Sequence, residues 1–279
     1  MNLLNREELS IIAAKLDYED LLSFCTTNKK HYKILWKRED IWTHKLMIEF
    51  PDYKTLPNKN FQSKKTLYFV LYSIKKHILP FILPLNYELD IYKVYLECSL
   101  TFVENSIEIL PKEIGLLTNL KVLHVAHNQI KVLPKELFYL TNLYFLDLTD
   151  NIIEVLPGEI GNLVNLEYLH LSENNITIIP LEIGKLNNLK ILTFQFNYIK
   201  EFPVEITYLT NLEKLDLSCN QLGSLPEEIG NMISLKYANL SNNYLESLPE
   251  SIGDLPNIEE IDISGNPVVE RFSEKYNYF

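Results

Sequence analysis

The sequence predicts an α/β protein. A solenoid of about eight parallel strands, with short helices on its convex side, follows a small all-α domain and a linker helix. The first observation is a pair of 23-residue rhythms, Asn128, Asn151, Asn174, Asn197, Asn220, Asn243 and Asn266 with Pro111, Pro134, Pro157, Pro180, Pro203, Pro226 and Pro249. A fixed period of roughly 20–50 residues is typical of stacked repeats. The second is that the preceding residues lack this period and instead space apolar residues as amphipathic helices do. Solenoids present long, regular surfaces, so binding is favoured over catalysis.

Each repeat is expected to hold one short strand and one turn. In the unit that ends at Asn151, the leucines Leu143, Leu146 and Leu148 should point inward and the residues between them outward. The asparagine can turn inward and satisfy backbone groups that the next turn would otherwise bury, which predicts a ladder of stacked asparagines. The Leu-Pro step ends the turn, and segments such as 113–117 should form a short helix on the convex side.

The repeat register extends backward to residues 96–111, where Leu100, Phe102, Asn105 and Ile107 fit and Glu97 replaces the first leucine. Eight strands are therefore expected between about residue 96 and residue 266. This pattern resembles the leucine-rich repeat family. The connecting motif LPxEIGxLxNL is similar to the 23-residue repeats of intracellular scaffold proteins of the Ras-suppressor type.

The outward positions of the strands make the concave face the candidate substrate-binding surface. One outward column reads Val122, Phe145, Tyr168, Ile191, Lys214, Tyr237 and Glu260, and Phe196 adds an aromatic side chain beside Ile191. Solvent-facing positions of a sheet need not be apolar, so Phe145, Tyr168, Ile191, Phe196 and Tyr237 predict a contact patch. The alternative is that β-propensity alone placed these residues in strands.

A second outward column begins with His124, Asp147 and His170, which we also include among the candidate substrate contacts. Neighbouring strands about 5 Å apart could bring the three side chains to one metal ion or make a proton-sensitive row. An exposed, hydrogen-bonded row is the favoured interpretation, and no metal or cofactor is predicted. Asp147, Asp216 and Asp262 occupy a position where the leucine-rich repeat family commonly carries aspartate, which indicates a scaffold role.

The first 47 residues predict three short helices. Leu4, Leu9, Ile12 and Leu16 follow a helical period, and Asp17 is a plausible N-cap for the next helix. These residues resemble an F-box, whose typical leucine, glutamate, apolar, Asp-Leu and tryptophan positions are occupied here by Leu4, Glu7, Ile12, Leu16, Asp20, Leu21 and Trp42. Asn5 and the pair Thr27-Asn28 depart from the usual F-box residues. The alternative is a helical cap that covers the exposed first repeat.

The resemblance implies three parts: an F-box-like domain at 1–47, a helical linker at 48–95 and the repeat solenoid at 96–279. A helix over 61–79 should pack Leu67, Val70, Leu71 and Ile74 onto the first repeats. F-box proteins of this kind are substrate receptors of cullin-based ubiquitin ligases. The F-box binds a Skp1-type adaptor, and the adaptor-facing and core residues would come from Leu4, Leu9, Ile12, Leu16, Leu21, Leu22 and Trp42.

No catalytic residue is required for that role, and the sequence holds no phosphate-binding, zinc-protease or serine-hydrolase motif. The main alternative is a scaffold that binds a small GTPase or a phosphatase subunit, with the N-terminal helices only as a cap. An enzyme with a metal at the histidine row is a third, less favoured interpretation.

Charge and composition favour one class of binding partner and one kind of cellular compartment. Residues 1–95 carry a net charge of +4 (15 Lys and Arg, 11 Asp and Glu) and the rest carry −15, which disfavours nucleic acid and favours a basic protein partner. No apolar run approaches the ~20 residues of a membrane span, and no signal peptide pattern opens the chain. Three scattered cysteines, odd in number and without a CxxC pair, are typical of a reducing compartment, so the cytoplasm or nucleus is expected. Frequent Asn, Ile, Lys and Tyr are typical of AT-rich genomes, and the composition is similar to that of giant-virus F-box proteins acting in a host cytoplasm as well as to cellular ones.

Overall fold

The computed structural model describes residue 16 and residues 39–55, 64–78 and 98–269. The chain divides into two compact units, Met1–Leu96 and Glu97–Phe279. Within the described ranges, none of the helices is both long and apolar enough to cross a membrane.

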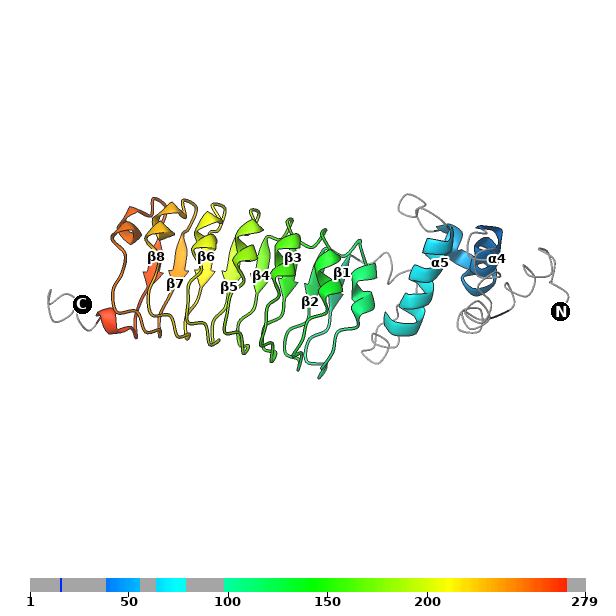
Figure 1. Ribbon diagram of the computed structural model, residues 1–279, viewed down its shortest axis with the longest axis horizontal. Coiled ribbons are helices and arrows are strands. Elements are labelled where there is room, and N and C mark those ends of the chain that lie inside the picture. Colours follow the sequence, from blue (N-terminus) through cyan, green and yellow to red (C-terminus); the bar gives the residue numbers. More distant parts are fainter. Residues whose placement is uncertain (1–15, 17–38, 56–63, 79–97, 270–279) are drawn as a thin grey trace, which may run out of the picture. The chain divides into compact units, whose positions relative to one another are not determined.

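In the first unit, the described elements are helical (Figure 1). The elements are α4 (Glu39–Glu49), the 3-10 turn η1 (Pro51–Thr55), α5 (Lys64–Ser73) and the π-helical turn η3 (Ile74–Ile78). Trp42 from α4 is 1% exposed, and its ring centroid lies 5.5 Å from that of Tyr68 and 5.3 Å from that of Phe69 on α5. Aromatic contacts of this kind add to the burial of apolar surface, and they hold the two helices together.

A buried polar network also joins α4 to α5. Lys45 is fully buried, and its ammonium donates hydrogen bonds to the Leu16 carbonyl and, at 2.9 Å, to the Glu49 carboxylate. The Tyr68 hydroxyl donates to the same carboxylate at 2.9 Å. A buried charge is tolerated only when it is paired and hydrogen-bonded, and Glu49 supplies that pairing.

The helix expected over 61–79 is α5 continued by η3, with Leu67, Leu71 and Ile74 buried and Val70 half-buried. Its packing onto the first repeats stays a prediction. Helix α4 runs to Glu49 and so crosses the expected domain boundary at residue 47.

The second unit is a solenoid with one three-residue strand per repeat. The eight strands form one parallel sheet in sequence order, as expected. They are β1 Ser99–Thr101, β2 Val122–His124, β3 Phe145–Asp147, β4 Tyr168–His170, β5 Ile191–Thr193, β6 Lys214–Asp216, β7 Tyr237–Asn239 and β8 Glu260–Asp262.

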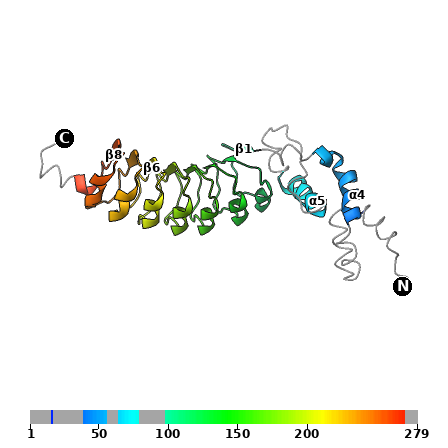
Figure 2. The ribbon, with the colours of Figure 1, turned by 90° about the horizontal axis from the view of Figure 1, so that it is seen from above.

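Short 3-10 helices return the chain between strands. They are η5 Lys112–Leu116, η6 Lys135–Tyr139, η7 Gly158–Asn162, η8 Leu181–Lys185, η9 Val204–Tyr208, η10 Glu227–Asn231 and η11 Glu250–Asp254. Within this unit the strands line one side of the array and the 3-10 helices the opposite side (Figure 2). A proline with φ near −65° to −75° precedes each of these helices, as at Pro180 with φ of −67°.

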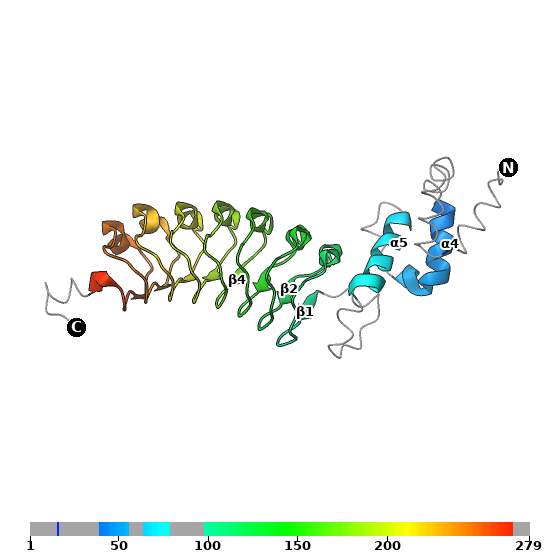
Figure 3. The same ribbon diagram turned by 60° about the horizontal axis from the view of Figure 1, so that its bottom comes forward.

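The core between the two sides is a continuous stack of leucine and isoleucine. In the fourth repeat Leu166, Leu169 and Leu171 are fully buried, and Ile183 closes the same layer from η8. The repeats stack one after another along the array (Figure 3), and most of them supply the same buried layer to their neighbours.

The asparagine ladder is present. The Asn174 Oδ1 accepts from the backbone N–H of Ile153 at 3.0 Å, and its amide nitrogen donates to the carbonyls of Leu148 and Leu171 at 2.9 and 3.2 Å. A second ladder was not anticipated, in which an exposed asparagine donates to a carbonyl of the preceding repeat. Its members are Asn142, Asn165, Asn188, Asn211 and Asn257.

Candidate functional site

The outward side of the sheet, called here the strand face, carries the residues that the sequence singled out for substrate binding. Strand pairing places Val122, Phe145, Tyr168 and Ile191 side by side in one register row, continued by Lys214, Tyr237 and Glu260. His124, Asp147, His170 and Thr193 form the parallel row two residues further along each strand. Equivalent positions align because consecutive parallel strands stack without a shift in register.

Phe145 is the centre of an aromatic cluster on this face. Its ring centroid lies 6.1 Å from that of Tyr168, 5.5 Å from His170 and 6.2 Å from His124. The spacings and tilted or edge-on angles are those that aromatic pairs favour. The sheet therefore holds a cluster of four rings, partly exposed, across β2, β3 and β4.

The histidine row forms separate pairs. His124 Nε2 lies 2.9 Å from the Asp147 carboxylate, whereas His170 Nδ1 lies 3.3 Å from the Thr193 hydroxyl. Burial lowers the pKa of His170 more than the nearby Asp147 raises it. The described residues contain no group of three or more His, Cys, Asp or Glu side chains arranged to hold a metal ion. The arrangement is thus a hydrogen-bonded row.

The aspartates of this row accept hydrogen bonds from residues that directly follow the strands. Asp147 Oδ1 accepts from the Thr149 N–H at 2.9 Å, and Asp216 Oδ1 accepts from both the N–H and the hydroxyl of Ser218 at 3.0 and 2.7 Å. Bonds of this kind fix the turn that follows the strand.

The strand face changes character toward its C-terminal end. There a hollow of about 350 Å³ is lined by Lys214, Leu215, Asp216, Tyr237, Ala238, Asn239, Glu260 and Asp262. The Tyr237 hydroxyl donates to Glu259 at 2.6 Å, which raises the pKa of the phenol. In the register row, Ile191 and Lys214 lie between Tyr237 and the aromatic cluster. The neighbours of Tyr237 in this row are the charged residues Lys214 and Glu260.

Phe196 lies outside the cluster, in the turn after β5. Its backbone has φ of 54° and its side chain is 51% exposed. The same turn position has positive φ in the other described repeats, for example at His127 and Asp150. A bulky residue in this left-handed region strains the backbone, so the fold alone does not explain an exposed phenylalanine at this position.

Comparison with known families decides the class of the array. The leucine rich repeat family model matches residues 118–176 and 210–268, and the leucine-rich repeat region model matches residues 154–236. Neither match extends before residue 118. The array is a leucine-rich-repeat solenoid.

Solved structures agree. The repeats are similar to a leucine-rich-repeat protein of Leptospira interrogans, at 30% identity and a TM-score of 0.50, over 64% of this chain and 58% of that one. They are also similar to the ectodomain of the Arabidopsis thaliana receptor kinase GASSHO1/SCHENGEN3, in complex with CASPARIAN STRIP INTEGRITY FACTOR 2. There the identity is 33% and the TM-score 0.54, over 57% of this chain and 20% of that one. The chain thus spans less than two thirds of either protein.

A third similar structure is a plant peptide hormone receptor, RGFR1, in complex with RGF2, at 32% identity and a TM-score of 0.52. The match covers 60% of this chain and 32% of the receptor. No curated protein sequence matches this chain significantly.

The leucine-rich repeats also carry a ladder of opposite charges beside the strand face that sequence reasoning missed. Lys190 bonds to Glu167 at 2.8 Å and Lys236 to Glu213 at 2.7 Å, each across one repeat. These bonds raise the pKa of both lysines and lower that of Glu213. The signal was available, because the four residues occupy one position of the 23-residue period.

The residues proposed for adaptor binding fall mostly outside the described ranges: Leu4, Leu9, Ile12, Leu21 and Leu22. Leu16 is half-buried, and Trp42 is buried between α4 and α5. Trp42 is therefore one of the core residues of the set.

Proposed function

We propose that this protein recognises another protein through the strand face of its repeats, with the Phe145 cluster as the main contact. The cluster of Phe145, Tyr168, His124 and His170 carries the proposal, since it sets four rings partly exposed on a sheet face that needs none of them for its core. Large, rigid aromatic side chains dominate the energetics of protein interfaces. Two similar solenoids belong to plant receptors, and they were solved in complex with CASPARIAN STRIP INTEGRITY FACTOR 2 and with RGF2. These complexes support this use of the fold.

Substitution of the cluster tests this role. The double variant Phe145→Ala and Tyr168→Ala should lose bound proteins from a cell extract, whereas Tyr208→Ala, at a 54% exposed tyrosine on η9, should keep them. Bound proteins are identified by mass spectrometry, and circular dichroism checks the fold. Equal capture by both variants would place the binding surface elsewhere.

We further propose that the protein is the substrate-recognition subunit of an SCF-type (Skp1-cullin-F-box) ubiquitin ligase, with no catalytic residue of its own. The F-box-like spacing of Leu4, Glu7, Ile12, Leu16, Asp20, Leu21 and Trp42 supports it. The burial of Trp42 against α5 is consistent with a tryptophan that closes a small helical domain. The acidic repeats would then favour a basic substrate.

An adaptor-binding measurement separates this role from a scaffold role. Purified full-length protein should bind a Skp1-type adaptor, and the change of Leu21 and Leu22 to Asp should abolish binding. The matched control is Leu181→Asp, at a leucine that is 60% exposed on the solenoid. If wild type captures no adaptor while a known F-box protein does, the ligase role is wrong, and a scaffold for a small GTPase or phosphatase subunit becomes the better account.

A further inference from the structure

Four apolar side chains form an exposed line along the first four repeats. Ile109, Val132, Val155 and Ile178 occupy the same position of successive repeats, four residues after each ladder asparagine or its equivalent. They are 75%, 69%, 70% and 74% exposed. We call these four residues the lateral stripe.

The fold does not require apolar residues at these positions. The fifth to seventh repeats carry Glu201, Ser224 and Ser247 instead, and the residues that follow the first two of these, Phe202 and Leu225, are still buried. An exposed row of β-branched apolar residues in one half of an array marks an interaction surface.

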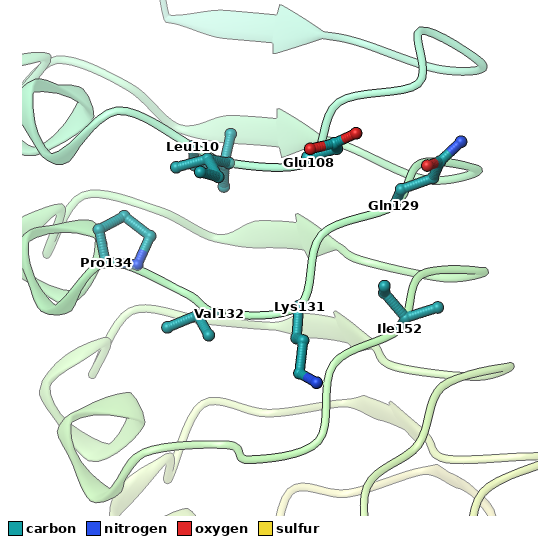
Figure 4. A pocket seen from close by; sticks show the side chains of 8 residues that line it. Glu108, Leu110, Gln129, Lys131, Val132, Pro134 and Ile152 are labelled. Carbon is teal, nitrogen blue, oxygen red and sulfur yellow. The ribbon is translucent and has the colours of Figure 1, made fainter.

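A β-bridge and a hollow lie at the N-terminal end of the stripe. Ile109 and Val132 form a parallel β-bridge, so neighbouring turns run side by side here. A hollow of about 620 Å³ lies between the turns, and five of its eight lining residues are apolar: Ile109, Leu110, Val132, Pro134 and Ile152. Figure 4 shows Val132 and Lys131 on one turn with Glu108 and Leu110 on the turn before it.

We propose that the lateral stripe binds the same stripe of a second copy of this chain, face to face and antiparallel. The stripe reads Ile-Val-Val-Ile and is therefore the same in both directions. In an antiparallel two-fold pairing Ile109 faces Ile178 of the second copy and Val132 faces Val155 of the second copy. One surface patch then complements itself, which is the condition for a closed dimer.

The flanking charges select this orientation. The position before each stripe residue holds Glu108, Lys131, Glu154 and Thr177. Antiparallel pairing sets Lys131 against Glu154 of the second copy, twice by symmetry, and Glu108 against a neutral threonine. Lys131 and Glu154 already lie 2.9 Å apart within one chain and remain more than half exposed, so the four charges would alternate at the dimer centre.

A column of uncharged residues lies beyond the charged column, on the same side of the stripe (Figure 4). It consists of Ser106, Gln129, Ile152 and Asn175. Antiparallel pairing therefore brings no like charges together in these two columns. The stripe and the strand face are separate surfaces, and the dimer does not rest on the proposed function.

Self-association of the full chain is the first test. Sedimentation velocity at up to about 100 μM should show dimers, because this concentration also reaches the micromolar affinities of weak, transient interfaces. Val155→Glu should weaken the dimer at least about tenfold by burying an unpaired charge. Ile233→Glu, at an isoleucine 54% exposed outside the stripe, should leave it unchanged. A monomeric wild type, or a dimer that persists in Val155→Glu, would overturn the proposal.

Charge reversal tests the orientation. Lys131→Glu and Glu154→Lys should each be monomeric, because each places like charges together twice at the dimer centre. Mixed in equal amounts, the two variants should form a heterodimer, because each Glu then faces a Lys. Circular dichroism of the two variants should match wild type, since the intrachain bridge is exposed. Failure of the mixture to dimerise would overturn the antiparallel arrangement.

Discussion

At the residue scale, the ladder asparagines hold the array together by satisfying backbone groups of two consecutive repeats. Asn174 is 4% exposed and accepts from one repeat while it donates to carbonyls of that repeat and its own. A carboxamide combines an acceptor and two donors on a short side chain, which no apolar residue offers. The 23-residue asparagine rhythm is therefore a hydrogen-bonding requirement of the fold.

Asn174→Ala should lower the free energy of unfolding by about 3 kcal/mol, because it leaves a buried N–H and several carbonyls without partners. Asn188→Ala removes one exposed hydrogen bond of the second ladder, at 2.8 Å, and should cost about 1 kcal/mol or less. Urea unfolding followed by circular dichroism measures both. Equal losses would mean that burial does not set the value of these bonds.

His170 predicts a pH dependence of stability. Burial lowers its folded pKa below the ordinary value of about 6.5, so the unfolded chain takes up the proton first as the pH falls. The neutral ring contributes fully above that value, and the contribution is lost as the pH falls from about 6.5 to the folded pKa.

His170→Gln removes this dependence. The drop in melting temperature between about pH 7.5 and pH 5.5 should be smaller in His170→Gln than in wild type. The control is His127→Gln. The hydrogen bond to Asp150 raises the pKa of His127, so the contribution of His127 to stability is present at low pH and is lost as the pH rises. An identical drop in wild type and His170→Gln would show that His170 is not shielded from water as described.

At the element scale, most pairs of consecutive 3-10 helices are in close contact at a glycine. A Cβ on Gly184 would lie 2.7 Å from the Glu205 carbonyl oxygen of the next repeat, and Gly161 meets Glu182 in the same way at 2.8 Å. Two repeats carry Phe138 and Thr207 at this position instead, both fully buried. The size of the residue at this position therefore limits how closely two consecutive helices can approach.

Gly184→Ala should destabilise the solenoid by about 1–3 kcal/mol, because backbone atoms must move to admit the methyl group. Gly253 holds the same position in the last repeat, where a Cβ would meet nothing within 4 Å. Gly253→Ala should be neutral or slightly stabilising, since it only restricts the unfolded chain. Thermal unfolding of both variants measures the difference, and a neutral Gly184→Ala would show that the helices tolerate wider spacing.

The sequence predicted which residues share a row of the sheet, but it did not predict how their side chains pair. The period fixed which residues share a row, so Phe145, Tyr168 and Ile191 were correctly placed together. It could not show that His124 pairs with Asp147 while His170 turns to Thr193, because side-chain torsions decide those bonds. The lateral stripe was missed because it lies in irregular segments after the asparagine, where no alternation distinguishes exposed from buried positions.

At the scale of the whole molecule, a repeat of a solenoid is most stable where it has neighbours on both sides. The isoleucine of the 3-10 helix shows this directly, since Ile183 and Ile229 are fully buried whereas Ile252 in the last repeat is half-buried. Ile261 of β8 is likewise 37% exposed, although its equivalent Leu215 of β6 is 1% exposed. Stability should therefore fall toward the C-terminal end of the array.

This gradient can be measured with one substitution at two equivalent sites. Ile183→Ala should lower the free energy of unfolding by about 3 kcal/mol, and Ile252→Ala by about 1 kcal/mol, because the second site loses less burial and leaves a smaller cavity. Hydrogen exchange should agree, with backbone amides near β8 exchanging faster than those of β4 through local opening of the end repeat. Equal costs at the two sites, or uniform exchange along the sheet, would contradict the gradient and would indicate that something covers the last repeat as fully as a neighbouring repeat does.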